Sequence, residues 1–373
     1  MNHELRPVGA AFLAFGTFAG VWAVTALDVE RAFSLTDAQL GFLLAAGIVA
    51  ATAAAATGGH LVERHGAGFA LSRSLGIWGA LLVVALSAPM LGVFAPAFIA
   101  ALAAGGVVDV VMNVVAADVL AHDPGRLVRF HGLFNLAALA GSALAGIALW
   151  LHASWRVVWA IVAVTGLLIG VGTRRARAEH TPEDQPPVLR ALASLRHDGL
   201  IPLATVFALA AMVEGGVATW GILYLRAHLG IGVLGGVGAY VVGQALATTM
   251  RMGGGTRIRD ARRAVAIGGA CAAIGIAAEA ISNNALIAAT GLAVAATGIT
   301  VVWPLLIAEV RNQAPRPTLA IGGVTACGYF GMVIGPPIVG VLSGVFNARV
   351  GLLFLVAAAA VVAIVPARIT SRV

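Results

Sequence analysis

The stretch FAPAFIAALAAGGVVDVVMNVVAA, residues 94–117, decides the fold, because it is long and apolar enough to cross a lipid bilayer. Its one charged residue, Asp109, is also the only side chain charged near neutral pH between Ser74 and Ala117. A carboxylate near the middle of a bilayer costs roughly 2.5–3.5 kcal/mol, so a chain keeps one where it faces a partner or water. Asp109 is therefore the first candidate for a functional residue.

The rest of the chain has the same character, since 60% of its 373 residues are hydrophobic and 10% are charged. Soluble domains carry about 25% charged residues, so a soluble fold is excluded. The composition predicts an all-α integral membrane protein without a separate soluble catalytic or nucleic-acid-binding domain. Twelve spans are expected, near residues 8–27, 37–58, 71–89, 92–117, 130–151, 155–172, 201–224, 231–250, 264–281, 285–307, 318–343 and 347–366.

All 23 basic residues are arginines, and the net charge is +7. With twelve spans, 19 of these arginines fall on one side of the membrane and four on the other. Arginine and lysine accumulate on the cytoplasmic side, which predicts a multi-pass protein of the bacterial cytoplasmic (inner) membrane with both termini in the cytoplasm. The net positive charge is thus explained by the orientation of the chain in the lipid bilayer, and no nucleic-acid partner is needed to account for it.

A polar segment that contains three prolines, residues 174–198, divides the spans six and six. It is expected to be a cytoplasmic linker, either partly disordered or helical along the membrane surface, between six-helix bundles at 1–173 and 199–373. Gly141 in the fifth span and Gly335 in the eleventh are 194 residues apart. Together with two six-helix halves whose features follow the same order, this indicates an internal duplication, as in transporters built from two related bundles.

The segment GGHLVERHG, residues 58–66, resembles the signature loop of the major facilitator superfamily, in which Gly is followed by three residues, an acid, Arg, any residue and Gly. The matching positions are Gly59, Glu63, Arg64 and Gly66. The resemblance implies a cytoplasmic latch that holds helices together in one transport state, and a solvated charged turn is the alternative. Further candidates for this gate lie at predicted cytoplasmic helix ends: Asp118, Glu309 and Arg311.

The fourth span adds a second similarity, because Asp109-Val-Val-Met-Asn113 is similar to the acid-x-x-x-Asn pattern of fucose permease. Met112-Asn113, Phe130-His131-Gly132 and Glu214-Gly215 resemble an uncharacterised bacterial branch near that permease. The resemblance implies twelve transmembrane helices in two six-helix bundles, which carry a small solute by alternating access without a cofactor. The acid of the first span of fucose permease is absent here, so the resemblance does not extend to a sugar substrate.

Two acids are candidates for proton coupling, Asp109 and Glu214, the only acid of the seventh span. Asp109 and Asn113 are four residues apart and share a helix face, and burial disfavours the charged form of a carboxyl, which suits a proton carrier. A packing or hydrogen-bonding carboxyl is the alternative for each acid. The candidates for substrate binding are amide and aromatic residues: Asn113, Trp22, Asn135, Trp220, Tyr240, Gln244, Trp303 and Tyr329.

For each of these aromatic residues, packing or anchoring at the membrane interface is the alternative. The clustered Trp150, Trp155 and Trp159 are expected to form such an interfacial belt, and Glu279, near the outer end of its span, is expected to reach water.

No arginine lies near the middle of a predicted span, which favours a neutral or cationic substrate over a phosphate or dicarboxylate. The sequence therefore predicts a monomeric, proton-coupled symporter of a small neutral organic solute, without a metal or a cofactor. A proton-driven efflux pump for drugs or metabolites is the closest alternative. An intramembrane enzyme or sensor is the alternative of another class, and the sequence shows no nucleophile motif or metal cluster to support it.

Overall fold

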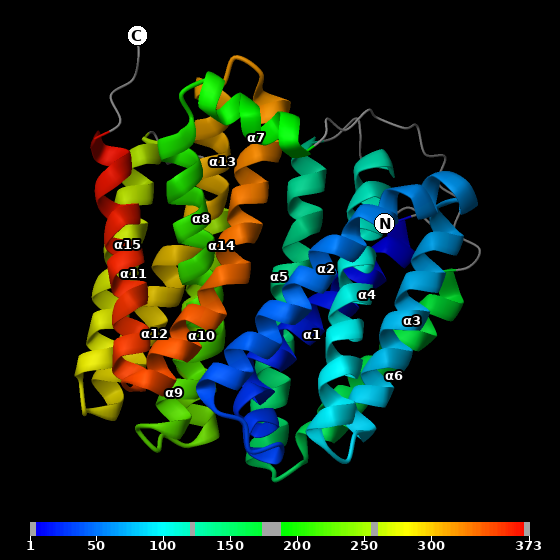
Figure 1. Cartoon of the computed structure of the whole chain (residues 1–373), viewed down its shortest axis with the longest axis horizontal. Coiled ribbons are helices and arrows are strands. Elements are labelled where there is room, and N and C mark those ends of the chain that lie inside the picture. The colour runs from blue at the N-terminus through cyan, green and yellow to red at the C-terminus, as the bar shows by residue number, and fades with distance from the viewer. Residues whose placement is uncertain (1–4, 120–123, 174–187, 255–259, 369–373) are drawn as a thin grey trace. The chain divides into compact units, whose positions relative to one another are not determined.

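The structure is a computed structural model that describes residues 5–119, 124–173, 188–254 and 260–368, and these residues form helices joined by short connections, with no strand among them (Figure 1). Within these described ranges, twelve helical stretches are long and apolar enough to cross a membrane. The predicted class, an all-α membrane protein with twelve spans, is confirmed.

The chain folds as two compact units. Unit 1 comprises Met1–Ser34 with Leu43–Glu183, and unit 2 comprises Leu35–Phe42 with Asp184–Val373. The first six helices are α1 (Leu5–Ala32), α2 (Asp37–His65), α3 (Ala67–Ser87), α4 (Leu91–Val119), α5 (Pro124–Trp150) and α6 (Trp155–Thr173). The others are α7 (Val188–His197), α8 (Ile201–Gly216), the π-helical turn η1 (Val217–Gly221), α9 (Ile222–Ala227), α10 (Val233–Gly254), α11 (Ala261–Ile281), α12 (Ala285–Thr300), α13 (Val302–Gln313), α14 (Pro317–Val345) and α15 (Ala348–Arg368).

Helices pair in the same order within each unit. In unit 1 the first span packs on the fifth (α1 on α5), and the third packs on the fourth and sixth (α3 on α4 and α6). In unit 2 α8 packs on α14, and α11 packs on α12 and α15, which repeats the same pattern six spans later. The glycines that suggested a duplication have equivalent places, since Gly141 meets Thr17 of α1 and Gly335 meets Met212 of α8. The internal pairing therefore agrees with a duplicated six-helix unit.

The segment that resembles the signature loop is mostly helical, which corrects the expected loop at residues 58–66. α2 begins after a capping box, in which Gln39 Oε1 accepts from Thr36 N and Thr36 Oγ1 accepts from Gln39 N. It then continues through Gly58 and Gly59 to His65. The chain turns at Gly66, whose φ of 80° is a conformation that glycine adopts without strain. Two glycines weaken a helix without ending it, and only the positive φ at Gly66 does so.

Two of the predicted spans are not continuous α-helices. The seventh, Ile201–Ala227, contains η1 between α8 and α9. The tenth, Ala285–Gln313, breaks at Val301 between α12 and α13. Pro304 explains the second break, because a proline removes the hydrogen bond to the carbonyl four residues earlier, here that of Thr300.

An aromatic cluster fills the interior of unit 1 and corrects the expected interfacial belt. Trp155 and Trp159 are buried, with 6% and 0% of their surface exposed, whereas Trp150 is 55% exposed. The Trp159 ring lies 5.4 Å from Phe18 and 5.7 Å from Phe98, and its Nε1 donates to Thr25 Oγ1 over 3.0 Å. A buried indole with a satisfied N–H serves as a packing residue, so only Trp150 keeps the surface position.

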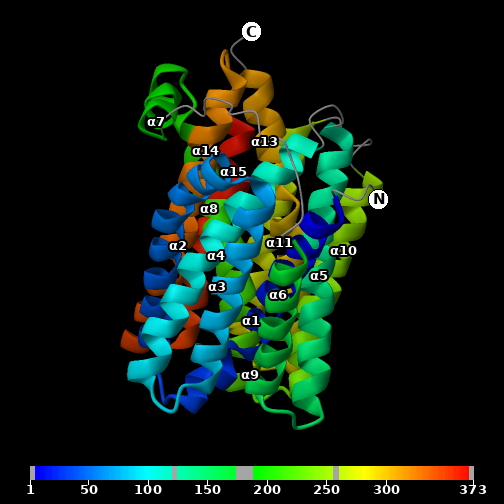
Figure 2. The same ribbon diagram turned by 90° about the vertical axis from the view of Figure 1, so that its right-hand side faces the viewer.

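The described end of the predicted linker is the amphipathic helix α7, which packs against α14 (Figure 2). Ala191 and Leu195 are buried at this contact, where a Cβ on Gly323 of α14 would lie 2.7 Å from the Ala191 carbonyl oxygen. Just after α7, Asp198 Oδ1 lies 3.0 Å from Arg316 Nη2 and 2.8 Å from His197 Nδ1. The helix is therefore fixed to unit 2 by apolar packing and by an ion pair.

This ion pair predicts a pH dependence at the linker. The hydrogen bond from His197, and then that from Arg316, holds the pKa of Asp198 below its usual value. Such a group stabilises the folded protein above its unfolded-state pKa of about 3.9 and loses this effect as pH falls through the folded-state pKa. The difference in melting temperature between wild type and Asp198→Asn should therefore be fully present at about pH 5 and should shrink as pH falls below about 3.9. Thermal unfolding in detergent measures it, and a difference that does not depend on pH would refute the assignment.

Candidate functional site

Asp109 and Asn113 form a hydrogen-bonded pair on α4. The Asn113 Nδ2 atom donates to the Asp109 Oδ1 atom over 3.1 Å and to the Asp109 carbonyl oxygen over 2.8 Å. The predicted shared helix face is thus confirmed for this pair. Both residues are half-buried, and Asn113 Oδ1 is buried without a hydrogen-bond partner among the described residues. The Oδ1 atom of Asn113 is therefore available as a hydrogen-bond acceptor beside the Asp109 carboxyl.

Close packing one turn earlier fixes the position of this pair. A Cβ on Gly106 would lie 2.2 Å from the Ala51 carbonyl oxygen of α2, and one on Gly105 would lie 3.0 Å from the Phe15 ring of α1. Small residues allow such backbone approach between helices in lipid. Asp109 follows Gly105 by four residues and Gly106 by three, so it lies on the side of α4 that faces α1 and α2. Within the described part of the chain, no arginine or histidine forms an ion pair with Asp109.

In unit 2, two of the predicted site residues are hydrogen-bonded to each other, and the charge of a third acts on one of them. Gln244 Nε2 donates to the Tyr240 hydroxyl over 3.0 Å, both on α10. Glu214 of α8 interacts electrostatically with the same Tyr240 side chain. The carboxyl, hydroxyl and amide groups are contributed by the seventh and eighth spans, which sequence spacing alone does not bring together. This group, Glu214, Tyr240 and Gln244, is called the unit 2 polar cluster below.

The remaining residues predicted to bind substrate occupy varied places. Trp22 stacks on Phe98 with 4.8 Å between ring centroids, as part of the aromatic cluster. Trp303 packs against Phe207 at 4.3 Å. These two rings therefore contribute to packing within their own units. Asn135 is half-buried, Tyr329 is 44% exposed, and Trp220 is 3% exposed, with no hydrogen-bond partner for its Nε1 among the described residues.

The predicted gate residues divide between the two units. Gly59, Glu63 and Arg64 lie in the last turns of α2, and Gly66 follows them. The side chains of Glu63 and Asp118 lie outside the residues that the structure describes at side-chain level. In unit 2, Glu309 Oε1 pairs with Arg262 Nε at 2.5 Å and also accepts from Gln313, while Arg311 is exposed.

Sequence reasoning missed two features of unit 2. Arg262 was one of many arginines in a basic stretch, and only the tertiary contact between α11 and α13 shows its pairing with Glu309. Glu279 was expected to reach water, but it is 1% exposed. Its position two residues before the end of α11 suggested exposure, whereas close packing of Gly221 and Gly291 encloses it. Among the described residues, no group of three or more His, Cys, Asp or Glu is arranged to hold a metal ion.

Comparisons with known proteins agree with this architecture. Residues 8–318 match the family model of the Major Facilitator Superfamily. The chain is 27% identical over 367 residues to a membrane protein, MosC, of Rhizobium meliloti, covering 96% of this chain and 88% of that protein. It is also 27% identical over 342 residues to an uncharacterised MFS-type transporter of Yersinia pestis, covering 89% and 87% of the two chains.

Solved structures show the same fold at low sequence identity. The nucleoside transporter NupG matches with a TM-score of 0.76 and 11% identity, over 97% of this chain and 98% of that one. A bacterial homologue of the human lysosomal transporter Spinster, in an inward-facing and unoccupied conformation, matches with a TM-score of 0.72 and 16% identity, over 98% and 96% of the two chains. The particular similarity to fucose permease stays a prediction. With twelve spans, a repeated pairing of helices and a family model that covers most of the sequence, the chain belongs to the Major Facilitator Superfamily of membrane transporters.

Proposed function

We propose that this transporter is a secondary active carrier that moves a small neutral organic solute together with protons. The observation that supports this most is Asp109, a carboxyl within an apolar span that is hydrogen-bonded by Asn113. A carboxyl in such surroundings is a reversible proton carrier, because burial opposes its negative charge while the amide of Asn113 can bond either protonation state. Proton binding and solute binding are then linked through the same polar groups.

The substrate class is inferred from the unit 2 polar cluster. Tyr240 and Gln244 provide a hydroxyl and an amide, which donate and accept hydrogen bonds without adding charge. A neutral solute with hydroxyl or amide groups fits this set. The absence of arginine near the middle of any span disfavours phosphates and dicarboxylates. Glu214 supplies the second proton-coupling carboxyl in this proposal.

The proposed mechanism is alternating access between two bundles, residues 1–173 and 199–373, joined by a cytoplasmic linker at 174–198 and with both termini in the cytoplasm of a bacterial cell. The repeated helix pairing supports it, because duplicated bundles that rock about a shared site are a common design of secondary transporters. In this proposal the end of α2 acts as the cytoplasmic latch, with Arg64 as its exposed charge.

A thermal-shift screen of the purified protein against sugars, nucleosides, amino acids and cationic drugs tests the substrate class. A neutral polar compound should raise the melting temperature of wild type, and by mass action a ligand at 100 times its Kd adds about 2.7 kcal/mol of stability. Gln244→Ala should reduce this shift, whereas Gln39→Ala, which removes only part of the α2 capping box, should leave it unchanged. Stabilisation by anionic or strongly cationic compounds alone would contradict the proposed class.

A further inference from the structure

Glu279 is the most completely enclosed acid among the described residues. It is 1% exposed, and neither of its carboxyl oxygens has a hydrogen-bond partner there. A Cβ on Gly221 of η1 would lie 3.4 Å from Glu279 Oε1, and one on Gly291 of α12 would lie 2.8 Å from the Glu279 backbone nitrogen. The carboxyl is therefore held between α11, α12 and η1, all within unit 2.

Among the residues that the structure describes, no group of opposite charge forms an ion pair with Glu279. Neither α12 nor η1 contains a titratable side chain, and α15 contains only Arg349 and Arg368, of which Arg349 bonds to Asn283. From α9, the Tyr224 hydroxyl donates to the carbonyl oxygen of Ala280 over 3.2 Å, and Arg226 is the other titratable residue of this helix. The titratable residues of α13 are Glu309 and Arg311. The others on α11 itself are Arg262, Arg263 and Cys271. Of these, Glu309 and Arg262 form an ion pair with each other.

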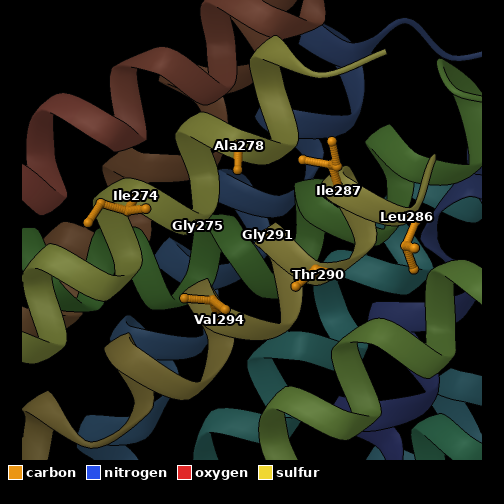
Figure 3. Close-up of a pocket in the computed structure, with 8 residues that line it drawn as sticks. All are labelled: Ile274, Gly275, Ala278, Leu286, Ile287, Thr290, Gly291 and Val294. Carbon is orange, nitrogen blue, oxygen red and sulfur yellow. The ribbon is translucent and has the colours of Figure 1, made fainter. Parts of the chain in front are cut away.

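The groove beside the helix that carries Glu279 is lined mainly by apolar residues. A groove of about 340 Å³ runs along the crossing of α11 and α12, where Gly275 and Gly291 allow the two backbones to meet (Figure 3). Ile274, Ala278, Leu286 and Val294 are among its apolar lining residues, and Thr290 is the one polar side chain in the lining. The groove flanks the helix that carries Glu279 without offering the carboxyl a polar partner, so a negative charge at this position would be neither solvated nor paired.

The π-helical turn η1 lies next to Glu279. At its start, the Val217 N–H is shared between the carbonyl oxygens of Glu214 and Val213. Such turns carry an irregular hydrogen-bond ladder and occur frequently at functional sites. Gly221, the last residue of η1, is the one in contact with Glu279, and Trp220 beside it also has an unsatisfied buried N–H.

We propose that Glu279 is a further proton-binding site of this transporter, beyond Asp109 and Glu214: a neutral carboxylic acid stored between α11, α12 and η1. The inference rests on the proposed proton coupling and extends it, because it adds a site at the α11–α12 crossing of unit 2 to Asp109 of α4 and Glu214 of α8. When the contact at η1 opens, water enters, the O–H bond of the acid breaks, and the proton passes to a water molecule. A carboxylate and a hydronium ion are left, and the contact closes again after the reverse transfer.

Infrared difference spectroscopy of the purified full-length protein near neutral pH tests the protonation state directly. A protonated carboxyl has a C=O band distinct from that of a carboxylate, so wild type should show this band, Glu279→Gln should lose one component, and Asp109→Asn should keep that component. Spectra of Glu279→Gln that retain every protonated-carboxyl band would overturn the proposal. A component of the C=O band that disappears only in Asp109→Asn comes from Asp109. The proton-carrier role of Asp109 and the proton site at Glu279 can therefore be refuted independently of each other.

Thermal stability provides a second measurement. The unfolded chain releases the Glu279 proton above about pH 4.3, while the folded chain keeps it, so stability from this group falls as pH rises. The folding equilibrium constant of wild type relative to Glu279→Gln should decrease about tenfold per pH unit between about pH 5 and pH 7. A constant ratio would contradict the inference. If Glu279→Gln does not fold, Glu279→Leu, which is uncharged and of similar size, takes its place in both measurements.

Discussion

Proteoliposomes that contain Asp109→Asn should exchange substrate across the membrane but should no longer accumulate it when a pH gradient is imposed. Asparagine retains the size of the side chain and can still accept the hydrogen bond from Asn113, whereas it has no proton to give or take. With one proton per substrate, a gradient of one pH unit drives about tenfold accumulation, because a tenfold ratio corresponds to about 1.4 kcal/mol. The variant should lose all of this accumulation, as measured with labelled substrate.

The matched control is Asp260→Asn, which makes the same chemical change outside the spans. Asp260 Oδ1 accepts from the backbone nitrogen of Arg263 over 3.0 Å and caps α11, and asparagine caps helices about as well as aspartate. This control should transport as wild type does. If Asp109→Asn accumulated substrate normally at every pH, Asp109 would not carry the coupled proton.

Gly20→Val should prevent unit 1 from assembling correctly. A Cβ on Gly20 of α1 would lie 1.9 Å from the Ala138 carbonyl oxygen and 2.8 Å from the Ser142 backbone nitrogen, both on α5. Backbone atoms cannot rotate away as a side chain does, so α1 and α5 must separate. Because the two helices form the most extensive described pairing of unit 1, we expect a loss of roughly 3 kcal/mol or more and little monodisperse protein on size-exclusion chromatography.

Gly76→Val serves as its control, because a Cβ on Gly76 of α3 meets nothing within 4 Å. The same substitution there should change stability by no more than about 1 kcal/mol and should leave the yield of folded protein unchanged. Equal damage from both variants would show that glycine content, rather than the contact between α1 and α5, limits the fold.

The fold was predictable because its signal is strong and local. Twelve apolar runs of bilayer length need no tertiary information, and the spacing of Asp109 and Asn113 places them on one face of any helix. Helix ends were less predictable. α2 passes through Gly58 and Gly59, because a glycine costs a helix about 1 kcal/mol and tertiary packing outweighs this, whereas Gly66 ends it through its backbone conformation.

The surroundings of each candidate residue depend on which helices pack together, and sequence spacing does not contain this information. Trp155 and Trp159 follow a short connection, like interfacial residues, yet they turn into the aromatic cluster of unit 1. Glu279 lies near a helix end, where exposure is the usual expectation, but two glycines on neighbouring elements close over it. The π-helical turn at Val217–Gly221 likewise has no sequence signature that separates it from the α-helix on either side.

The most direct test of proton-coupled transport is to record internal pH in proteoliposomes while substrate is added outside, without any imposed gradient. Wild type should move protons inward with the substrate, so that internal pH falls at a rate that follows substrate uptake, and Asp109→Asn should take up substrate to equilibrium with no change in pH. Uptake by wild type that leaves internal pH unchanged, or an equal pH change in wild type and Asp109→Asn, would contradict the assignment of the coupled proton to Asp109.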